Sequence, residues 1–548
     1  MNISLLSNIN LLSVAKNLNK KFNININKPD GYGIWIEEFL NPNSEFISDK
    51  IDAVFVILDG EILKKHYWNI NDLIYQLTQT VNKHPFVKFF ISNIHINNKY
   101  ISNYKDQTLY KTYEYNWNKS IVELCQNKDN VTILDIKELI EKIGTEKFYS
   151  DKLWYLASAP FSTLGENMIT EHIENILNSL SIARKKCIIL DLDNTLWEGV
   201  IGEDGVDNIV LSENKEGARF KDFQRRLLEI KNTGVILAIC SKNNINDALE
   251  VFNHPHMILK KSDFAIMKIN WEPKYKNIQD IAQELNIGLD SMVFIDDNPV
   301  EQELVHSQLP EVIVAEFPKD TSDLSKFAKD LYEKYFMVIS ASEEDLNKTK
   351  MYIENIQREE YKVSFNDLNE YFLSLKTIVK ISLANKRDIP RIAQLTQKTN
   401  QFNLTTKRYT EKEIEQFMNS EDYLVYTGWV SDKFGDNGLC LVIIVKIVKS
   451  KEESVAFIDT YLMSCRVMCR NIEFAVIDYI KKKLQKKMVT ELCGNYLPTI
   501  KNKPVEKFYE QCGFEFIGFE KEANQCFSFN LIQDIEQKNY YLDLIGDE

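Results

Sequence analysis

The sequence has no apolar run that approaches the ~20 residues needed to cross a lipid bilayer. Its opening stretch, MNISLLSNINLL, also lacks the basic residues that precede the apolar part of a signal peptide. We therefore expect no membrane partner and a cytoplasmic location.

Cysteine is present, but without the spacing of a metal site or a disulfide framework. The 9 cysteines are an odd number, and they form neither a C-x-x-C pair nor a Cys/His cluster with zinc spacing. Scattered cysteines of this kind favour reduced thiols, as in a cytoplasmic protein.

Positive charge is in deficit, with 66 Lys and Arg against 80 Asp and Glu and a net charge of −14. Because an acidic surface repels a phosphate backbone, we expect no nucleic-acid partner. A small phosphorylated ligand would have to be held locally, by a metal ion or by a few basic side chains.

The 548 residues suggest three or four domains, and 44% hydrophobic with 27% charged residues excludes global disorder. We find no internal repeats. The apolar pattern indicates an α/β block at 1–180, a second α/β block at 185–316, a charged helical connector at 317–373 and an α+β block at 374–548.

Short buried strands alternate with helices in the first two blocks, which is typical of parallel sheets with crossover helices. The first block has predicted strands within 51–60 and 87–94 and a predicted helix at 72–84. The second has predicted strands within 186–195, 235–243 and 291–299, and predicted helices within 218–234, where Gly234 ends the helix, and 244–252.

Acidic side chains end two strands of the second block. Asp191 and Asp193 follow one apolar run, and Asp296 and Asp297 follow another. Open α/β sheets bind ligands at the carboxyl ends of their strands, so we expect these carboxylates to converge. Converging carboxylates are ligands that suit Mg²⁺.

Two further residues complete a phosphate site. Ser241 ends the strand that lies between the two acidic pairs in the sequence, and it is a neutral hydrogen-bond donor. Lys274, in the segment WEPKYKN, supplies the cation that a phosphate site needs. The sequence therefore predicts a magnesium-dependent phosphate site.

The motifs D-x-D-x-T, Ser, Lys and D-D, in this order, resemble those of the haloacid dehalogenase (HAD) superfamily of phosphotransferases. The resemblance implies that Asp191 is the nucleophile and that Asp193 is the general acid and then the general base. It also implies that Ser241 hydrogen-bonds the phosphoryl group and that Lys274 neutralises developing charge and holds Asp191.

The same resemblance implies a Mg²⁺ site and an active site that is open to solvent. Its metal ligands would be Asp191, the carbonyl of Leu192, Asp193, Asp296 and Asp297. The intervals from Asp191 to Ser241 and from Ser241 to Lys274 are too short for a cap domain. We therefore expect a capless HAD-like Rossmann domain that could accept a substrate presented by a macromolecule.

A narrower resemblance is to the FkbH-like proteins, the subclass IIIC phosphatase relatives. FkbH-like proteins are glyceryl transferases of polyketide pathways. The resemblance implies dephosphorylation of 1,3-bisphosphoglycerate and loading of the glyceryl unit onto the phosphopantetheine thiol of an acyl carrier protein. It is carried by the central segments 191–211, 240–244, 270–278 and 294–301, and by the outer segments 30–46, 154–162, 399–410, 432–439, 457–473 and 496–514.

Thioester formation needs a thiol, and two cysteines are candidates. Cys240 directly precedes Ser241, although strand alternation puts the two side chains on opposite sides. Cys465 lies in the segment SCR. The sequence leaves open whether Cys240, Cys465 or neither takes part.

The strand, loop and helix between residues 454 and 484 resemble an acyl-CoA-dependent N-acetyltransferase (GNAT-like) domain, in which the loop and the helix N-terminus hold a pyrophosphate. The resemblance implies a cofactor site at Arg466, Cys469, Arg470 and Asn471. Because Cys469 and Asn471 stand where that family has Gly or Gly/Ala, coenzyme A, a phosphopantetheine arm and an unliganded scaffold all stay open.

The order of elements and Ser7-Asn8 in the first block faintly resemble SGNH-type hydrolases. A GDS motif and a D-x-x-H at Asp151 are missing, so we expect a non-catalytic Rossmann/SGNH-like domain. Five lysines within 481–487 end a predicted helix, where they either favour the helix dipole and solvation or dock an acidic carrier protein.

These observations favour a three-domain α/β enzyme with a C-terminal GNAT-like α+β domain. The leading hypothesis is a Mg²⁺-dependent glyceryl transferase of natural-product biosynthesis. The alternatives are a phosphatase or phosphotransferase for another small phosphorylated substrate, and an N-acyltransferase that uses acyl-CoA.

Overall fold

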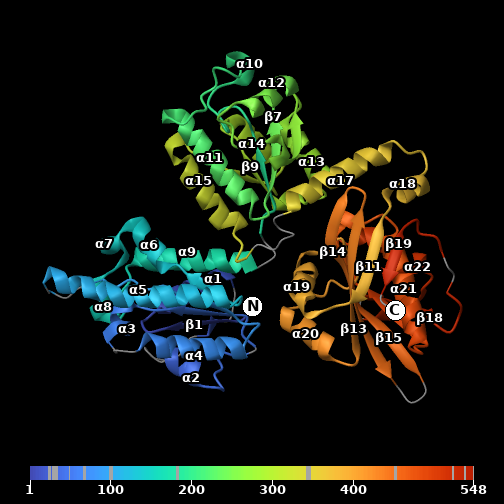
Figure 1. Cartoon of the computed structure of the whole chain (residues 1–548), viewed down its shortest axis with the longest axis horizontal. Coiled ribbons are helices and arrows are strands. Elements are labelled where there is room, and N and C mark those ends of the chain that lie inside the picture. Colours follow the sequence, from blue (N-terminus) through green and yellow to red (C-terminus); the bar gives the residue numbers. More distant parts are fainter. Residues whose placement is uncertain are drawn as a thin grey trace. The chain divides into compact units, whose positions relative to one another are not determined.

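The computed structural model separates into two compact units, residues 1–180 and 181–548, each described by itself (Figure 1). Part of the segment 30–46, which carried the FkbH-like resemblance, lies outside the described residues. The structure describes the chain except residues 23–25, 28–34, 49, 66–68, 98–100, 102, 181–183, 341–346, 450–452, 521–523, 536–537 and 547–548.

Unit 1 is built on a parallel five-stranded sheet in the order β2-β1-β3-β4-β5. Every residue of β1 and β3 is buried, because helices cover both faces of the sheet. The predicted strands within 51–60 and 87–94 and the predicted helix at 72–84 are confirmed as β3, β4 and α4. The strands are β1 (Ile3–Ser7), β2 (Ile26–Asn27), β3 (Ala53–Ile57), β4 (Lys88–Ser92) and β5 (Val131–Leu134).

The helices of unit 1 alternate with its strands. They are α1 (Leu12–Phe22), α2 (Trp35–Leu40), α3 (Gly60–Lys65), α4 (Ile70–Lys83), α5 (Tyr104–Asn127), α6 (Ile136–Ile143), α7 (Thr145–Phe148), α8 (Asp151–Ala157) and α9 (Thr163–Leu180).

The central part of unit 2 contains a second parallel sheet, in the order β10-β9-β6-β7-β8. The strands predicted within 186–195, 235–243 and 291–299 are confirmed as β6, β7 and β9. Strands β8 and β10 were not predicted; both lie at sheet edges, and their partly exposed residues weaken the buried-strand pattern. The strands are β6 (Cys187–Leu190), β7 (Ile236–Ser241), β8 (Phe264–Ile269), β9 (Met292–Ile295) and β10 (Ile313–Ala315).

Helices cover both faces of this sheet, and Gly234 ends the longest crossover helix, α11, as predicted. Gly234 follows α11 with a φ of +92°, a conformation that favours glycine. The helices are α10 (Ile201–Asp204), α11 (Lys215–Lys231), α12 (Ile245–Glu250), α13 (Lys274–Glu284), α14 (Pro299–Gln308) and α15 (Leu324–Leu331).

The core of the central domain continues past residue 316. Leu324, Ala328 and Leu331 of α15 and the following Phe336 pack in the same hydrophobic cluster as β6 and α11. Two more helices, α17 (Lys348–Val363) and α18 (Leu368–Leu375), then lead to the C-terminal domain.

The C-terminal domain has a mostly antiparallel sheet in the order β17-β18-β16-β15-β14-β13-β11-β19. Strands β15 and β16 are parallel, and they pair only between Val455–Ile458 and residues 491–494. The far end of β15 pairs instead with β12, where Phe402 lies opposite Met463. The two parallel strands therefore part, and the chain around β12 fills the space between their ends.

The long strands predicted here, LCLVIIVKIV and ESVAFIDTYLMS, are confirmed as β14 and β15. The strands are β11 (Ile378–Leu383), β12 (Phe402–Asn403), β13 (Tyr423–Asp432), β14 (Gly435–Lys449), β15 (Ser454–Met463), β16 (Glu491–Tyr496), β17 (Glu515–Glu520), β18 (Asn524–Asn530) and β19 (Asp543–Gly546). The helices are α19 (Ile389–Lys398), α20 (Glu411–Asn419), α21 (Ile472–Lys486) and α22 (Phe508–Gln511).

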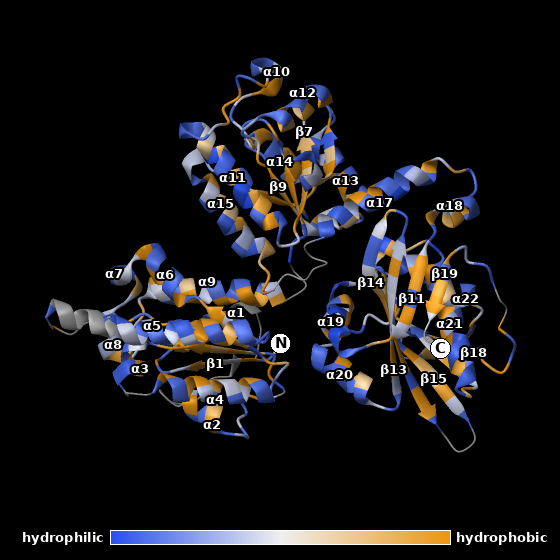
Figure 2. Ribbon diagram, in the orientation of Figure 1, coloured by the Kyte–Doolittle hydropathy of each residue, from blue (hydrophilic) through white to orange (hydrophobic). Residues whose placement is uncertain are grey.

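Apolar residues concentrate in the strands of the sheets, and the helices carry a mixture of apolar and polar residues (Figure 2). This distribution is what amphipathic helices packed on sheets produce. Among the helices that the structure describes, none is both long enough and apolar enough to cross a membrane.

Helix α17 is fixed to the C-terminal domain by a buried ion cluster. The Arg358 guanidinium, 1% exposed, donates from Nε and Nη2 to the two carboxylate oxygens of Asp432, at 2.6 and 3.0 Å. Arg470 Nη1 donates to the same carboxylate at 3.0 Å. Tyr352 and Ile356, on the same helix, pack against the core of the central sheet.

We predict that Asp432→Ala destabilises unit 2 by about 3–5 kcal/mol, because it removes the carboxylate that two buried guanidinium groups share and leaves Arg358 only the more distant Glu354, at 3.9 Å. Urea denaturation followed by circular dichroism measures the change. Lys350→Ala is the control: its ammonium is exposed and lies 4.0 Å from Glu354, so the loss should stay below about 1 kcal/mol. Equal effects of the two substitutions would contradict the role of Asp432.

Candidate active site

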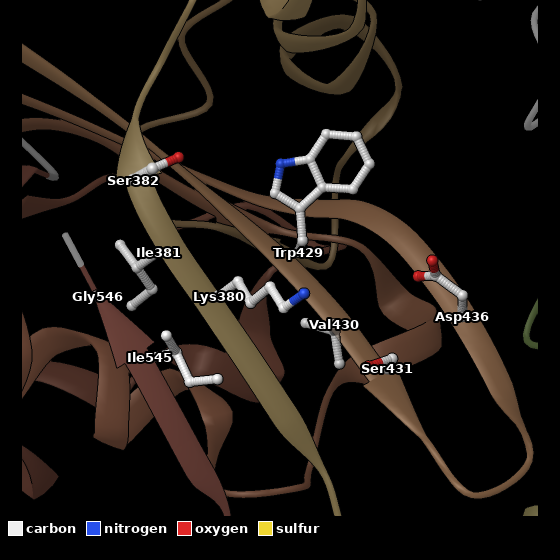
Figure 3. Close-up of a pocket in the computed structure, with 9 residues that line it drawn as sticks. All are labelled: Lys380, Ile381, Ser382, Trp429, Val430, Ser431, Asp436, Ile545 and Gly546. Atoms are coloured by element: carbon white, nitrogen blue, oxygen red, sulfur yellow. The ribbon is translucent and has the colours of Figure 1, made fainter.

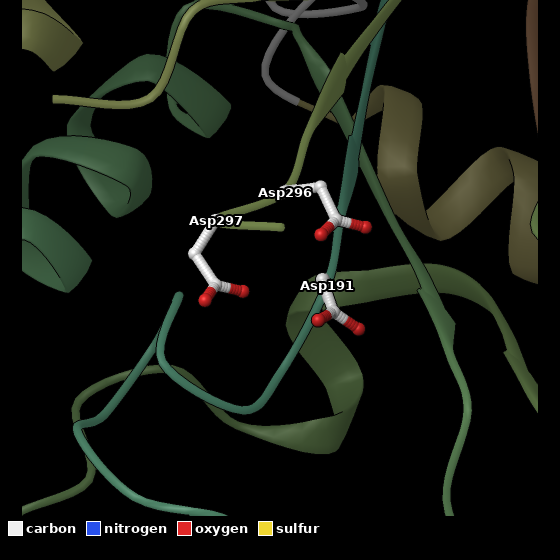
Figure 4. A group of neighbouring side chains, drawn as sticks. All are labelled: Asp191, Asp296 and Asp297. Carbon is white, nitrogen blue, oxygen red and sulfur yellow. The ribbon is translucent and has the colours of Figure 1, made fainter. Parts of the chain in front are cut away.

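Three carboxylates meet at the carboxyl edge of the central sheet. Strands β6 and β9 are neighbours, and Asp191 N–H donates to the Ile295 carbonyl at 3.0 Å. Asp191, Asp296 and Asp297 each turn an oxygen toward a common point, and these oxygens lie within 4.8 Å of one another (Figure 4). The convergence expected from the strand ends therefore occurs.

Lys274 lies between two of these carboxylates. It begins α13, its side chain is 4% exposed, and its Nζ lies 3.1 Å from Asp191 Oδ1 and 2.6 Å from Asp296 Oδ2. Burial alone would lower the pKa of this ammonium, but the two carboxylates raise it, and the net shift is upward. Lys274 is therefore held in its charged form between the two carboxylates.

Asp193 lies next to this cluster in a different environment. Its Oδ1 accepts hydrogen bonds from Trp197 Nε1 at 3.1 Å and from Ile201 N–H at 3.0 Å. Burial raises the pKa of Asp193, the nearby Asp191 charge adds to the rise, and these donors oppose it. A raised pKa makes a carboxyl group easier to protonate, which suits a general acid.

Asn243 links Asp193 to Ser241, and the sequence reasoning did not single it out. Its Nδ2 donates to Asp193 Oδ2 at 2.9 Å and to Ser241 Oγ at 3.1 Å. The signal for it was its place two residues after Ser241, in the loop at the end of β7. Because Oδ1 of Asp193 already accepts two donors, Oδ2 is the oxygen left to carry a proton.

The three carboxylates fit Mg²⁺ by their chemistry. Carboxylate oxygens are the ligands that Mg²⁺ prefers, and a cation would relieve the repulsion among these groups. Burial raises the pKa of Asp296 and of Asp297 to about 6, and the charge of Asp191 contributes to both shifts. Asp297 has no lysine within salt-bridge distance among the described residues, so it is the carboxylate that most needs a cation.

The Leu192 carbonyl, a ligand implied by the resemblance, is already engaged. It accepts hydrogen bonds from the backbone N–H groups of Thr195 at 3.1 Å and Leu196 at 2.8 Å. A carbonyl oxygen has two lone pairs, so binding a metal there would cost one of these bonds.

The Cys240 thiol is buried in apolar surroundings close to the site, where the charges of Lys274, Asp191 and Asp296 act on it. Its side chain is fully buried in the apolar cluster on the opposite face of the sheet from Leu190, and its Sγ contacts the Lys274 carbonyl at 3.6 Å. The alternation expected from the sequence is thus present. Burial raises the pKa of the Cys240 thiol, which disfavours the thiolate that a nucleophile needs.

Cys465 belongs to the C-terminal domain, in the turn Cys465–Val467 that follows β15. Burial raises the pKa of Tyr352 on α17, and nearby Cys465 and Cys187 add to the shift, so this tyrosine lies close to both thiols. The Cys465 side chain itself is partly buried.

Two arginines of the implied cofactor loop make contacts with other parts of the protein. Arg466 contacts Met351 of α17 through Nη1, and Arg470 binds Asp432 and Asn355. Cys469 and Asn471 each have a φ of +60°, the left-handed conformation in which glycine is favoured. The backbone thus keeps a shape that suits Gly, although neither residue is Gly.

The N-terminus of α21 already holds an anion. Burial raises the pKa of the Glu473 carboxyl group to about 6, and the nearby backbone N–H groups of Glu473 and Cys469 oppose this rise. One of its oxygens, Oε2, is buried without a hydrogen-bond partner among the described residues. The side chain is 7% exposed. A bound pyrophosphate would have to compete with this carboxylate for the loop donors.

One lysine of the 481–487 group is not at the surface, which corrects the sequence interpretation. Lys481 is 2% exposed, and its Nζ donates to the Cys512 carbonyl at 2.6 Å and lies 3.1 Å from Asp478. It also packs over Phe529. A docking patch could therefore include only the remaining lysines.

In unit 1, Ser7 and Asn8 hold the sheet together. Ser7 Oγ donates to the Ile57 carbonyl at 2.6 Å, and the Asn8 side chain exchanges two hydrogen bonds with the backbone of Asp59. These contacts join the ends of β1 and β3 and occupy the groups that suggested a hydrolase.

A separate hollow of about 450 Å³ lies on the C-terminal sheet, over β11, β13 and β19 (Figure 3). Lys380 and Trp429 line it from neighbouring strands. It contains none of the residues predicted to act on phosphate, so it is distinct from the carboxylate cluster.

Comparison with known proteins gives structural relatives only. No family model and no curated protein matches the chain. The chain is similar to the N-terminal part of the protein BF1531 from Bacteroides fragilis, which contains a phosphatase domain and was solved as a complex with Mg. The two are 28% identical with a TM-score of 0.56, and the match covers 62% of this chain and 94% of that one. This share is larger than any single domain of the chain.

Two acetyltransferases are also similar over a smaller share. The ribosomal-protein-S18-alanine N-acetyltransferase from Escherichia coli is 15% identical with a TM-score of 0.22, and the match covers 29% of this chain and 96% of that one. An N-acetyltransferase from Staphylococcus aureus Mu50 is 15% identical with a TM-score of 0.23, and the match covers 28% and 99%.

We predict that Mg²⁺ affinity falls as the pH drops below 6. Asp296 and Asp297 take up protons with pKa values raised to about 6, and each proton must leave before the metal binds. The apparent Kd should rise about tenfold per pH unit for each proton displaced. Isothermal titration calorimetry between pH 5 and pH 8 measures it, and a constant Kd across this range would contradict the prediction.

Proposed function

We propose that this chain is a Mg²⁺-dependent phosphoryl-transfer enzyme that dephosphorylates 1,3-bisphosphoglycerate and loads the glyceryl unit onto the thiol of an acyl carrier protein. The observation that carries the phosphoryl-transfer part is the arrangement of Asp191, Lys274 and Asp296 with Asp193 beside them. The similarity to a phosphatase domain solved with Mg supports it.

Asp191 is the nucleophile of the proposed reaction. One of its carboxylate oxygens attacks the phosphorus of the phosphate ester, and the bond from phosphorus to the ester oxygen breaks, so that the acyl phosphate is kept for the transfer step. Asp193 gives the proton on its Oδ2 to that oxygen. Asp193 then takes a proton from a water molecule, which attacks phosphorus and releases Asp191 and inorganic phosphate.

The surrounding residues hold the phosphoryl group for this chemistry. Lys274 and the Ser241 hydroxyl supply a positive charge and a hydrogen-bond donor at the site, and both are nearly buried. Mg²⁺ bound by Asp191, Asp296 and Asp297 would offset the charge of the phosphoryl oxygens. Asn243 donates a hydrogen bond to each of Asp193 and Ser241 and so fixes their relative positions.

The transfer step needs a thiol that attacks the carbonyl carbon of the acyl phosphate. In that step the bond between this carbon and the phosphate oxygen breaks, phosphate leaves with the electron pair, and a thioester forms. Because the Cys240 thiol is fully buried and burial raises its pKa, we propose direct attack by the carrier thiol. The phosphopantetheine arm would bring that thiol to the open site.

A simple phosphatase or phosphotransferase for another small phosphorylated substrate is the second candidate. The burial of Cys240 favours it, because a buried thiol with a raised pKa is a poor nucleophile. Acyl-CoA-dependent transfer has less support, since the Glu473 carboxyl group lies beside the backbone N–H groups of the loop.

We predict that Asp191→Asn lowers phosphate release by about 10³-fold or more, because the amide keeps the size of the side chain but cannot act as the nucleophile. Phosphate release from 1,3-bisphosphoglycerate and from 4-nitrophenyl phosphate measures the effect. The control is Asp222→Asn, an exposed carboxyl group paired with Arg225 on α11, which should keep the wild-type rate. Normal turnover by Asp191→Asn would refute the assignment of Asp191 as the nucleophile.

We predict that wild-type protein, Cys240→Ala and Cys465→Ala all give a glyceryl-sized adduct on an acyl carrier protein incubated with 1,3-bisphosphoglycerate and Mg²⁺. Intact-mass spectrometry of the carrier detects the adduct. Loss of the adduct in one cysteine variant, with phosphate release retained, would show an enzyme-bound thioester. If the wild type releases phosphate but forms no adduct, the transferase hypothesis is rejected and the simple phosphatase is the remaining candidate.

A further inference from the structure

Lys242 is a second lysine at the carboxyl edge of the central sheet, beside Lys274. It directly follows Ser241, the last residue of β7. It is the only basic residue between the ends of β6, β7, β8 and β9 and the helices α11–α14, in the segments 191–214, 242–244, 270–273 and 296–298. Lys274, which begins α13, is already paired with Asp191 and Asp296. Lys242 is therefore the one basic side chain that these segments offer to a second negative charge on a ligand.

The Lys242 side chain reaches from the loop after β7 to the helix after β9. Its Nζ donates to Glu301 Oε1 at 2.6 Å, and Glu301 lies in the first turn of α14. Because β6 lies between β7 and β9 in the sheet, this ion pair joins the two sides of the strand end that carries Asp191. The charges of Glu301 and Asp191 both act on the buried Cys240 thiol, so the ion pair lies near the proposed nucleophile.

The Lys242 ammonium can bind more than its present partner. An ammonium group has three N–H donors, and among the described residues Nζ of Lys242 donates only to Glu301. The Lys242 side chain is 33% exposed and that of Glu301 is 13% exposed, so an anion that approaches from solvent meets the ammonium first. Glu301 also fixes the ammonium in one place, which lowers the entropy that binding a ligand would cost.

We infer that Lys242 binds a second negatively charged group of the phosphorylated substrate and so selects substrates with two anionic groups. The inference rests on the proposed phosphoryl-transfer site, where Lys274, Ser241 and Mg²⁺ hold the first group. In the proposed reaction the second group is the acyl phosphate, which stays on the substrate while the ester phosphate is removed. A hydrogen bond from an ammonium to an anion is shorter and stronger than a hydrogen bond between neutral groups.

Two unreactive phosphonates of equal chain length test this role without turnover, because their carbon–phosphorus bond resists hydrolysis. 4-Phosphonobutyrate ends in a carboxylate, and butylphosphonate ends in a methyl group. In the presence of Mg²⁺, calorimetry should show that the wild-type protein binds 4-phosphonobutyrate about tenfold more tightly, as one charged hydrogen bond provides. Lys242→Met should remove about this whole preference, and Lys242→Arg should keep most of it.

Lys231→Met is the matched control. Lys231 forms an ion pair of the same length, 2.6 Å, with Asp263. It ends α11 just ahead of β7, at the opposite edge of the sheet, so the variant should keep the wild-type preference. An unchanged preference in Lys242→Met, or a wild-type protein that binds both phosphonates equally, would overturn the inference. The second of these results does not depend on the folding of any variant.

Release of phosphate from 1,3-bisphosphoglycerate is measured separately. Its absence in the wild type would refute the proposed function, and the phosphonate preference would still show whether Lys242 binds a second anionic group. Conversely, phosphate release without any phosphonate preference would refute the role of Lys242 and keep the proposed function.

Discussion

A buried ammonium group between two buried carboxylates organises the central site. Lys274 is 4% exposed, Asp296 is fully buried and Asp191 is nearly so. Removing one partner from such a group leaves an uncompensated charge in a poorly solvated place, which costs several kcal/mol. The start of α13 and the ends of β6 and β9 must therefore meet at one point, and the order β10-β9-β6-β7-β8 brings them there. Asp193, Ser241 and Asn243 are then arranged around a charge pattern that already exists.

Much of this arrangement could be predicted from the sequence, since each functional residue of the central domain stands at or just after a strand end. Apolar runs followed by acidic residues locate Asp191 and Asp296, because parallel strands bring their carboxyl ends to one edge. The sequence could not indicate which residue of Lys242-Asn243-Asn244 faces the site. That choice depends on loop geometry. Asn243 hydrogen-bonds Asp193, Asn244 accepts a hydrogen bond from Trp271, and Lys242 forms an ion pair with Glu301.

Long-range packing also explains why Lys481 and Arg470 of the C-terminal domain make contacts that the sequence did not indicate. Lysine is usually a surface residue, yet Lys481 is surrounded by Asp478, a backbone carbonyl and two aromatic rings. Such burial arises from long-range packing, which local charge patterns do not encode. Arg470 likewise lies in a loop that sequence reasoning connected with a ligand, but the connector helix α17 and Asp432 engage it. A helix 16 residues long thus links a loop of one sheet to the core of another.

Glu473 puts a carboxyl group inside the protein at the start of α21. The backbone around it has left-handed turns at Cys469 and Asn471, and its N–H groups act on this carboxyl group. An internal carboxylate of this kind is always present and is independent of any metabolite concentration. Any anion that approached this loop would therefore be repelled by a charge that the protein itself supplies.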